Sequence, residues 1–164
     1  MSDLVVATVL IVFSTILIIG LSFLIESFIG HNYYIDFCRV TEKILIGECG
    51  WLWTLCGVIL LNILEEIVAR WLFVGYLPKF FGPTIFWAFL IISNGLWTWS
   101  HIFIYEPKDR HIIVLLPLFI IGFVYAYFYL MLGLVFVILS HIATNLVLWF
   151  SYKLFFSSYR LAIP

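Results

Sequence analysis

Long apolar runs separated by short polar segments fill most of the chain. Five of these runs approach the roughly 20 residues that an α-helix needs to span the hydrocarbon core of a bilayer. They cover residues 4–25, 51–77, 84–105, 112–132 and 134–156. A polar connection over residues 26–50, a Pro-Gly-Pro turn, a charged hinge over residues 106–111 and Gly133 separate them. The pattern predicts an all-α fold, a polytopic membrane helix bundle of about five transmembrane helices.

The composition agrees with a lipid environment. Of 164 residues, 65% are hydrophobic and 10% are charged, and the mean hydropathy is +1.20. Soluble domains carry about 25% charged residues. We therefore expect a multi-pass integral membrane protein, in a prokaryotic cell membrane, with one membrane domain over residues 1–164 and a motif-bearing core at about 51–156.

The charge balance also bears on partners. The net charge is -1, and the chain has neither a basic stretch nor a dinucleotide-binding fingerprint. These features speak against a nucleic-acid partner. Membrane lipid and a membrane-associated peptide or protein substrate are the expected partners, and the sequence specifies no oligomeric state.

Three charged residues lie in the middle of the second apolar run, namely Glu65, Glu66 and Arg70. One charge at the centre of a bilayer costs about 2.5–3.5 kcal/mol on insertion scales, so such residues need an internal partner and mark a functional site. Glu66 and Arg70 are four residues apart, about 40° around an α-helix, and should form an ion pair. Glu65 lies about 140° from Arg70. We therefore expect Glu66 to be structural and Glu65 to be the free acid or base.

Further polar side chains lie in the third and fifth apolar runs. His101 is in the third, and His141 and Asn145 are four residues apart in the fifth, on one helical face. Converging on one polar pocket with Glu65 would satisfy all of them, whereas each would otherwise face lipid alone. A buried polar knot that only locks helices together, or a proton relay in a transporter or channel, is the alternative. Glu65, His101 and His141 could also bind zinc, although no H-E-x-x-H pair is present.

The order and spacing of these residues resemble a known family. Glu65-Glu66-x-x-x-Arg70, then Trp97-x-x-x-His101, then His141-x-x-x-Asn145 is similar to the three-motif signature of the CaaX protease and bacteriocin-processing family. These glutamic intramembrane proteases include type II CAAX prenyl proteases and abortive-infection-type proteins. The resemblance covers roughly residues 60–148. The chain departs from it at Trp97, where the family usually has Phe, and at Tyr105, where many relatives have Asn.

The resemblance implies an intramembrane endopeptidase that cleaves a membrane-associated or CAAX-type substrate without a cofactor. It implies that Glu65 and His101 activate a water, that His141 and Asn145 form an oxyanion hole, and that the Glu66–Arg70 pair holds the helix. A zinc-dependent membrane metalloprotease and a non-catalytic scaffold or immunity protein are the alternatives.

The expected helices place two of these residues at different depths. Glu65 lies 14 residues from the start of its helix and His101 four residues from the end of its own. At 1.5 Å per residue this is a mismatch of about 15 Å. We attribute it to misplaced helix ends rather than to tilt.

Overall fold

The computed structural model describes residues 3–29, 50–104 and 115–155, and this part of the chain is helical, without a strand, apart from turns at Leu77, Gly82 and Gly133. Most of the polar connection, the charged hinge and Tyr105 lie outside the described residues. The main α-helices are α1 (Asp3–Ile29), α3 (Gly50–Glu66), α5 (Phe86–Ser100), α6 (Leu116–Leu132) and α7 (Leu134–Phe155). The described residues therefore confirm the all-α fold class.

The second apolar run is not one α-helix, as the sequence had led us to expect. It begins as α3 and continues directly as a π-helix, η1 (Ile67–Tyr76). The bond from Leu77 N to Leu72 O, 2.8 Å long, has the five-residue spacing of that helix. Because a π-helix has a wider turn, the 3.6-residue spacing used for Glu65, Glu66 and Arg70 holds only as far as Glu66.

Two glycine turns reverse the chain at the positions that the sequence predicted. After η1 come the short helices α4 (Pro78–Phe81) and η2 (Pro83–Ile85), joined at Gly82 with φ 85°. Gly133, with φ 86°, joins α6 to α7. Positive φ is readily available only to glycine, so these residues make the close reversals possible. At its end α5 tightens into a 3₁₀ turn, η3 (His101–Ile104).

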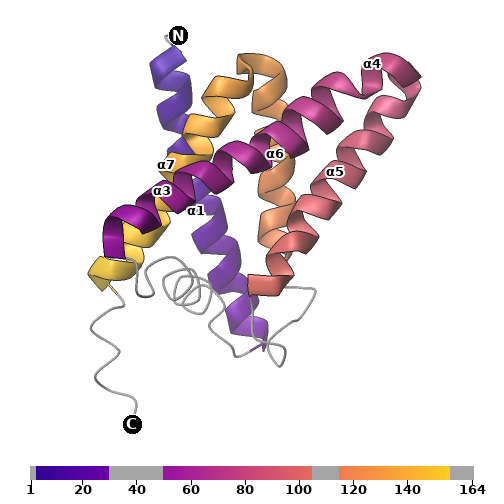
Figure 1. The fold of residues 1–164 in the computed structure, drawn as a ribbon. Helices are drawn as coiled ribbons and strands as arrows, with labels where there is room; N and C mark the ends of the chain where they lie inside the picture. The colour runs from indigo at the N-terminus through magenta and orange to yellow at the C-terminus, as the bar shows by residue number, and fades with distance from the viewer. Residues whose placement is uncertain (1–2, 30–49, 105–114, 156–164) are drawn as a thin grey trace.

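The helices form a bundle in which α3 and η1 make one long inclined rod (Figure 1). From the turn at α4, α5 runs back at an angle to this rod, while α6 and α7 form a hairpin. The helix α1 packs against both α6 and α7, and α3 packs against α7. Residues from α3, α5 and α7 therefore meet inside the bundle.

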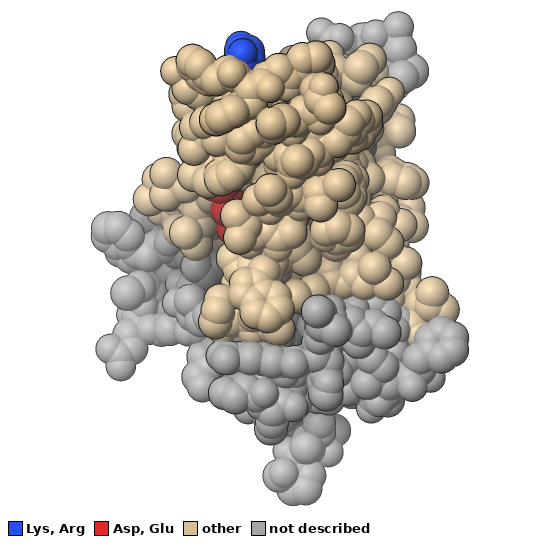
Figure 2. Space-filling model, turned by 90° about the vertical axis from the view of Figure 1, so that its right-hand side faces the viewer, with Lys and Arg blue, Asp and Glu red and all other residues tan. Residues whose placement is uncertain are grey.

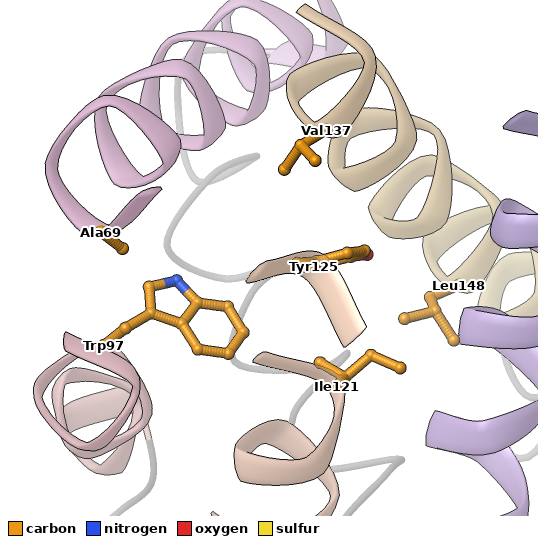
Figure 3. Close-up of a cluster of buried hydrophobic side chains, with 6 residues drawn as sticks. All are labelled: Ala69, Trp97, Ile121, Tyr125, Val137 and Leu148. Carbon is orange, nitrogen blue, oxygen red and sulfur yellow. The ribbon is translucent and has the colours of Figure 1, made fainter. Parts of the chain in front are cut away.

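The core lies where η1, α5, α6 and α7 meet (Figure 3). Its buried members are Ala69, Trp97, Ile121, Tyr125, Val137 and Leu148. The α5–α6 contact is close because a Cβ at Gly122 would overlap the side chain of Asn94. The Asn94 amide donates to Phe119 O at 2.7 Å.

The distribution of polarity is inverted relative to a soluble protein. Glu66, Arg70, Asn94 and Thr144 are fully buried, whereas large apolar side chains cover the outside, among them Leu4, Phe80, Trp87, Phe103 and Val135. Among the described helices, one is long and apolar enough to cross a membrane, residues Leu4–Leu21 of α1, with a mean hydropathy of 2.9. Leu116–Leu132 and Leu134–Phe150 are shorter apolar helices, so five spans stay a prediction.

Candidate active site

Glu66 lies at the centre of a buried charge cluster. Its Oε2 is 3.3 Å from Arg70 Nε, which is the ion pair that the four-residue spacing predicted. Both side chains are 0% exposed. Its Oε1 is 2.8 Å from His141 Nδ1, a contact that the sequence did not suggest. Within the described residues no Arg70 nitrogen makes a hydrogen bond, so its contact with Glu66 is ionic. The guanidinium also lies 5.3 Å from the centre of the Trp97 ring.

Glu65 lies beside this cluster and remains accessible. Its side chain is 31% exposed, and its Oε2 is 3.9 Å from His141 Nε2. Sequence reasoning left Glu65 without a partner in its own helix, and the structure supplies one from α5, because Trp97 Nε1 donates to Glu65 Oε2 at 2.8 Å. On the face drawn in Figure 2, acidic atoms reach the surface in one small area surrounded by non-charged side chains. Glu65 is thus oriented by one hydrogen bond and keeps acceptor capacity.

His101 begins the 3₁₀ turn at the end of α5 and is buried. Its Nδ1 lies 2.8 Å from Trp97 O. A carbonyl oxygen only accepts, so His101 Nδ1 must carry the proton and donate it. In the neutral ring this leaves Nε2 as a lone-pair acceptor, available to a reacting group.

His141 is held in a similar way from α7. Its Nδ1 faces Glu66 Oε1, a carboxylate oxygen, and therefore acts as the donor. The ring centre is 4.9 Å from that of Tyr125, which is fully buried and was not among the residues that the sequence singled out. The carboxylate and the aromatic ring fix the imidazole and direct its Nε2 to the side of Glu65.

Asn145 occupies the next turn of α7. Its Nδ2 donates to Asn62 Oδ1 at 2.8 Å, and Asn62 Nδ2 donates to Val58 O at 2.8 Å within α3. Sequence reasoning missed Asn62, although the signal was present. Asn62 is an amide in an apolar helix four residues before Glu66, on the same face.

Trp97 joins the parts of the site. Its indole N–H donates to Glu65, and its ring lies 4.7 Å from the His101 ring and 5.8 Å from the His141 ring, between centres. The expected depth mismatch between Glu65 and His101 does not come from misplaced helix ends. Both helices end within two residues of the expected positions, counting η1 and η3. Instead, α5 is inclined to the segment formed by α3 and η1 (Figure 1), and Trp97 contacts both Glu65 and His101.

The arrangement provides one accessible carboxylate, two oriented imidazoles and one oriented amide. These groups can accept a proton from water and donate hydrogen bonds to a developing oxyanion. Among the described residues, no group of three or more His, Cys, Asp or Glu is arranged to hold a metal ion.

Comparison with known proteins agrees with the motifs. The family model described as type II CAAX prenyl endopeptidase Rce1-like matches residues 47–147, more than half of the chain and the part that carries all three motifs. No curated protein and no solved structure matches the chain. The matched family consists of membrane proteases of CAAX processing, which confirms the resemblance. The chain belongs to the type II CAAX prenyl endopeptidase Rce1-like family.

Proposed function

We propose that this protein is a multi-pass intramembrane endopeptidase that hydrolyses a peptide bond in a membrane-associated, CAAX-type substrate. The observation that carries the proposal is the state of Glu65. It is an oriented, part-exposed carboxylate in an apolar bundle, held by Trp97 and flanked by His141. The family match supports the reaction class, and the geometry of the site supports the assignment of roles to residues.

Water activation is the first step of the proposed reaction. Glu65 has one oxygen engaged by the Trp97 N–H and retains further lone pairs that can take a proton from water. His101, whose Nδ1 is committed to a backbone carbonyl, offers Nε2 as the second acceptor. The hydroxide oxygen then attacks the scissile carbonyl carbon, and the proton held by Glu65 or His101 passes to the leaving amine.

Stabilisation of the tetrahedral intermediate is assigned to α7. His141 already donates through Nδ1, so it can donate to an oxyanion through Nε2 only as an imidazolium. With that charge, His141 and Arg70 balance the carboxylates of Glu65 and Glu66, and the cluster is neutral. Asn145 uses one Nδ2 hydrogen for Asn62 and has a second to offer.

The inverted surface supports membrane embedding with several passes. Charged, amide and imidazole side chains of α3, η1, α5 and α7 are buried, and many large apolar side chains are exposed on the described exterior. In lipid, polar side chains need to lie inside the protein, because no water is available there to bind them. In water the same surface would leave a large apolar area exposed.

Cleavage of defined peptides by the purified protein in lipid vesicles tests the proposal. Three fluorogenic peptides are compared: one with a farnesylated CAAX terminus, its unprenylated counterpart, and a transmembrane peptide. We expect cleavage of at least one by the wild type and by Thr15→Val, a control that removes a buried hydroxyl donating to Ile11 O. Glu65→Gln should cleave none. Full activity of Glu65→Gln, or an inactive wild type, would contradict the proposal.

A further inference from the structure

Two polar side-chain contacts connect α3 and α7, and they are four residues apart on both helices. Glu66 pairs with His141, and four residues earlier on α3 Asn62 pairs with Asn145, four residues later on α7. The helices are therefore antiparallel here and joined by two successive polar contacts. His141 and Asn145 both carry proposed roles, and each has a partner on α3 at the matching position.

Asn62 is a buried amide in an apolar helix, and both of its polar ends are hydrogen-bonded. It is 3% exposed, and a buried amide without partners would cost stability. Both ends of its amide are used: Nδ2 donates to Val58 O, and Oδ1 accepts from Asn145 Nδ2, each at 2.8 Å. Asn145 is only half-buried, so the pair connects the interior of the bundle to the site.

A backbone carbonyl fixes the orientation of both amides. Val58 O can only accept, so the nitrogen of Asn62 must face it and the oxygen of Asn62 must face Asn145. That oxygen in turn accepts only from the nitrogen of Asn145. Turning either amide by 180° would place two acceptor oxygens against each other. Only one orientation of the pair therefore satisfies both hydrogen bonds.

We infer that Asn62 is a positioning residue that acts through Asn145. By holding one Nδ2 hydrogen of Asn145, it fixes the plane of that amide and directs the second hydrogen at the position where the oxyanion forms. Preorganised donors stabilise a developing charge because they need no reorientation during the reaction. The inference rests on the proposed function and adds a residue outside the three motifs to it.

A kinetic double-mutant cycle tests the inference. It uses the full chain in lipid vesicles and whichever of the three fluorogenic peptides the wild type cleaves. Asn62→Leu keeps the side-chain size and removes both hydrogen bonds. We expect its kcat to fall about tenfold, the effect of losing one oriented hydrogen bond, with KM within about twofold. Asn145→Ala should lower kcat by about 10²–10³.

The double variant decides whether Asn62 acts through Asn145. If it does, Asn62→Leu should lower kcat no further once Asn145 is alanine. A fall of the same factor in both backgrounds, or an unchanged kcat in Asn62→Leu alone, would overturn the positioning role. Thr15→Val, which replaces a buried hydroxyl that donates to Ile11 O within α1, should retain the wild-type kcat.

A stability cycle separates this inference from the proposed function. Melting temperatures of Asn62→Leu, Asn145→Leu and the double variant measure whether the two amides are coupled, independently of any reaction. Coupled melting with a wild type that cleaves no peptide would reject the proposed function, and the positioning role with it, while leaving the contact intact. Additive melting with an active wild type would reject the positioning role alone.

Discussion

Replacing either residue of the buried Glu66–Arg70 pair should destabilise the protein, and the two substitutions should lower the free energy of unfolding by different amounts. Each side chain is 0% exposed, so either single substitution leaves the other charge inside the bundle. Breaking a buried pair by removing one partner costs about 3–5 kcal/mol. Replacing both partners costs less, because no unpaired charge remains.

The contacts that remain after each substitution determine which one costs more stability. In Arg70→Met, Glu66 retains the hydrogen bond from His141 Nδ1 at 2.8 Å, so we expect a loss near the lower end, about 3 kcal/mol. In Glu66→Gln, Arg70 loses its ionic partner at 3.3 Å, and no described residue accepts a hydrogen bond from its nitrogens. The Trp97 ring compensates only in part, so we expect about 5 kcal/mol.

Thermal unfolding of the purified variants in detergent measures these losses. At about 2–4 °C per kcal/mol for a chain of this size, Arg70→Met should melt roughly 6–12 °C lower and Glu66→Gln roughly 10–20 °C lower. Intrinsic tryptophan fluorescence is the suitable signal, because Cys56 is exposed and would react with a thiol dye in the folded state. The exposed Lys79→Met, a matched loss of positive charge, should melt within about 2 °C of the wild type.

The double variant provides the decisive comparison. Arg70→Met/Glu66→Gln should melt higher than Glu66→Gln alone, because the uncompensated guanidinium is gone. If the double variant instead lost the sum of the two single losses, the two residues would not be coupled. The assignment of Glu66 and Arg70 as one buried charge pair would then be refuted.

Three other outcomes follow from the structure. Glu65→Gln should melt within about 2 °C of the wild type, because its amide oxygen can still accept the Trp97 N–H, while turnover falls at least 10²–10⁴-fold; a large loss of melting temperature would assign Glu65 a structural role. Gly122→Ala should lower stability by about 1–3 kcal/mol by displacing the Asn94 side chain, whereas Gly95→Ala, with nothing near its Cβ position, should not destabilise the protein; equal melting of the two would contradict the close α5–α6 contact. Exhaustive chelation should leave peptide cleavage unchanged in the proposed mechanism, and loss of cleavage with recovery on adding Zn²⁺ would establish the zinc-dependent alternative.

The positions of the helices could largely be predicted from the sequence, but the π-helical part of the second apolar run could not. The start at Gly50, the break after Tyr76 and the turn at Gly133 follow from apolar run length and from glycine and proline. The π-helix over Ile67–Tyr76 has no such signal, because an apolar run in lipid shows no polar face whose period could report the residues per turn. The π-helix begins directly after Glu66 of the candidate site, and π-helical geometry is often found at functional sites.

The structure brings together the candidate residues that the sequence singled out, but the contacts between them could not be predicted from the sequence. Charged, imidazole and amide side chains are conspicuous in apolar helices, and Glu65, Glu66 and His141 are examples. Which of the two carboxylates meets His141 depends on the rotation of α3 against α7, a tertiary property. Glu66, expected to serve Arg70 alone, holds both Arg70 and His141.

Trp97 belongs to both the candidate site and the hydrophobic core. It belongs to the buried cluster with Ile121 and Tyr125 (Figure 3), and its indole N–H donates to Glu65. A phenylalanine, usual in the family by the resemblance above, could fill the space and could not donate that hydrogen bond. In this chain the orientation of Glu65 therefore depends on a residue whose ring also packs in the core against side chains of α6. A substitution that loosens the core near Trp97 should for that reason lower kcat before it unfolds the protein.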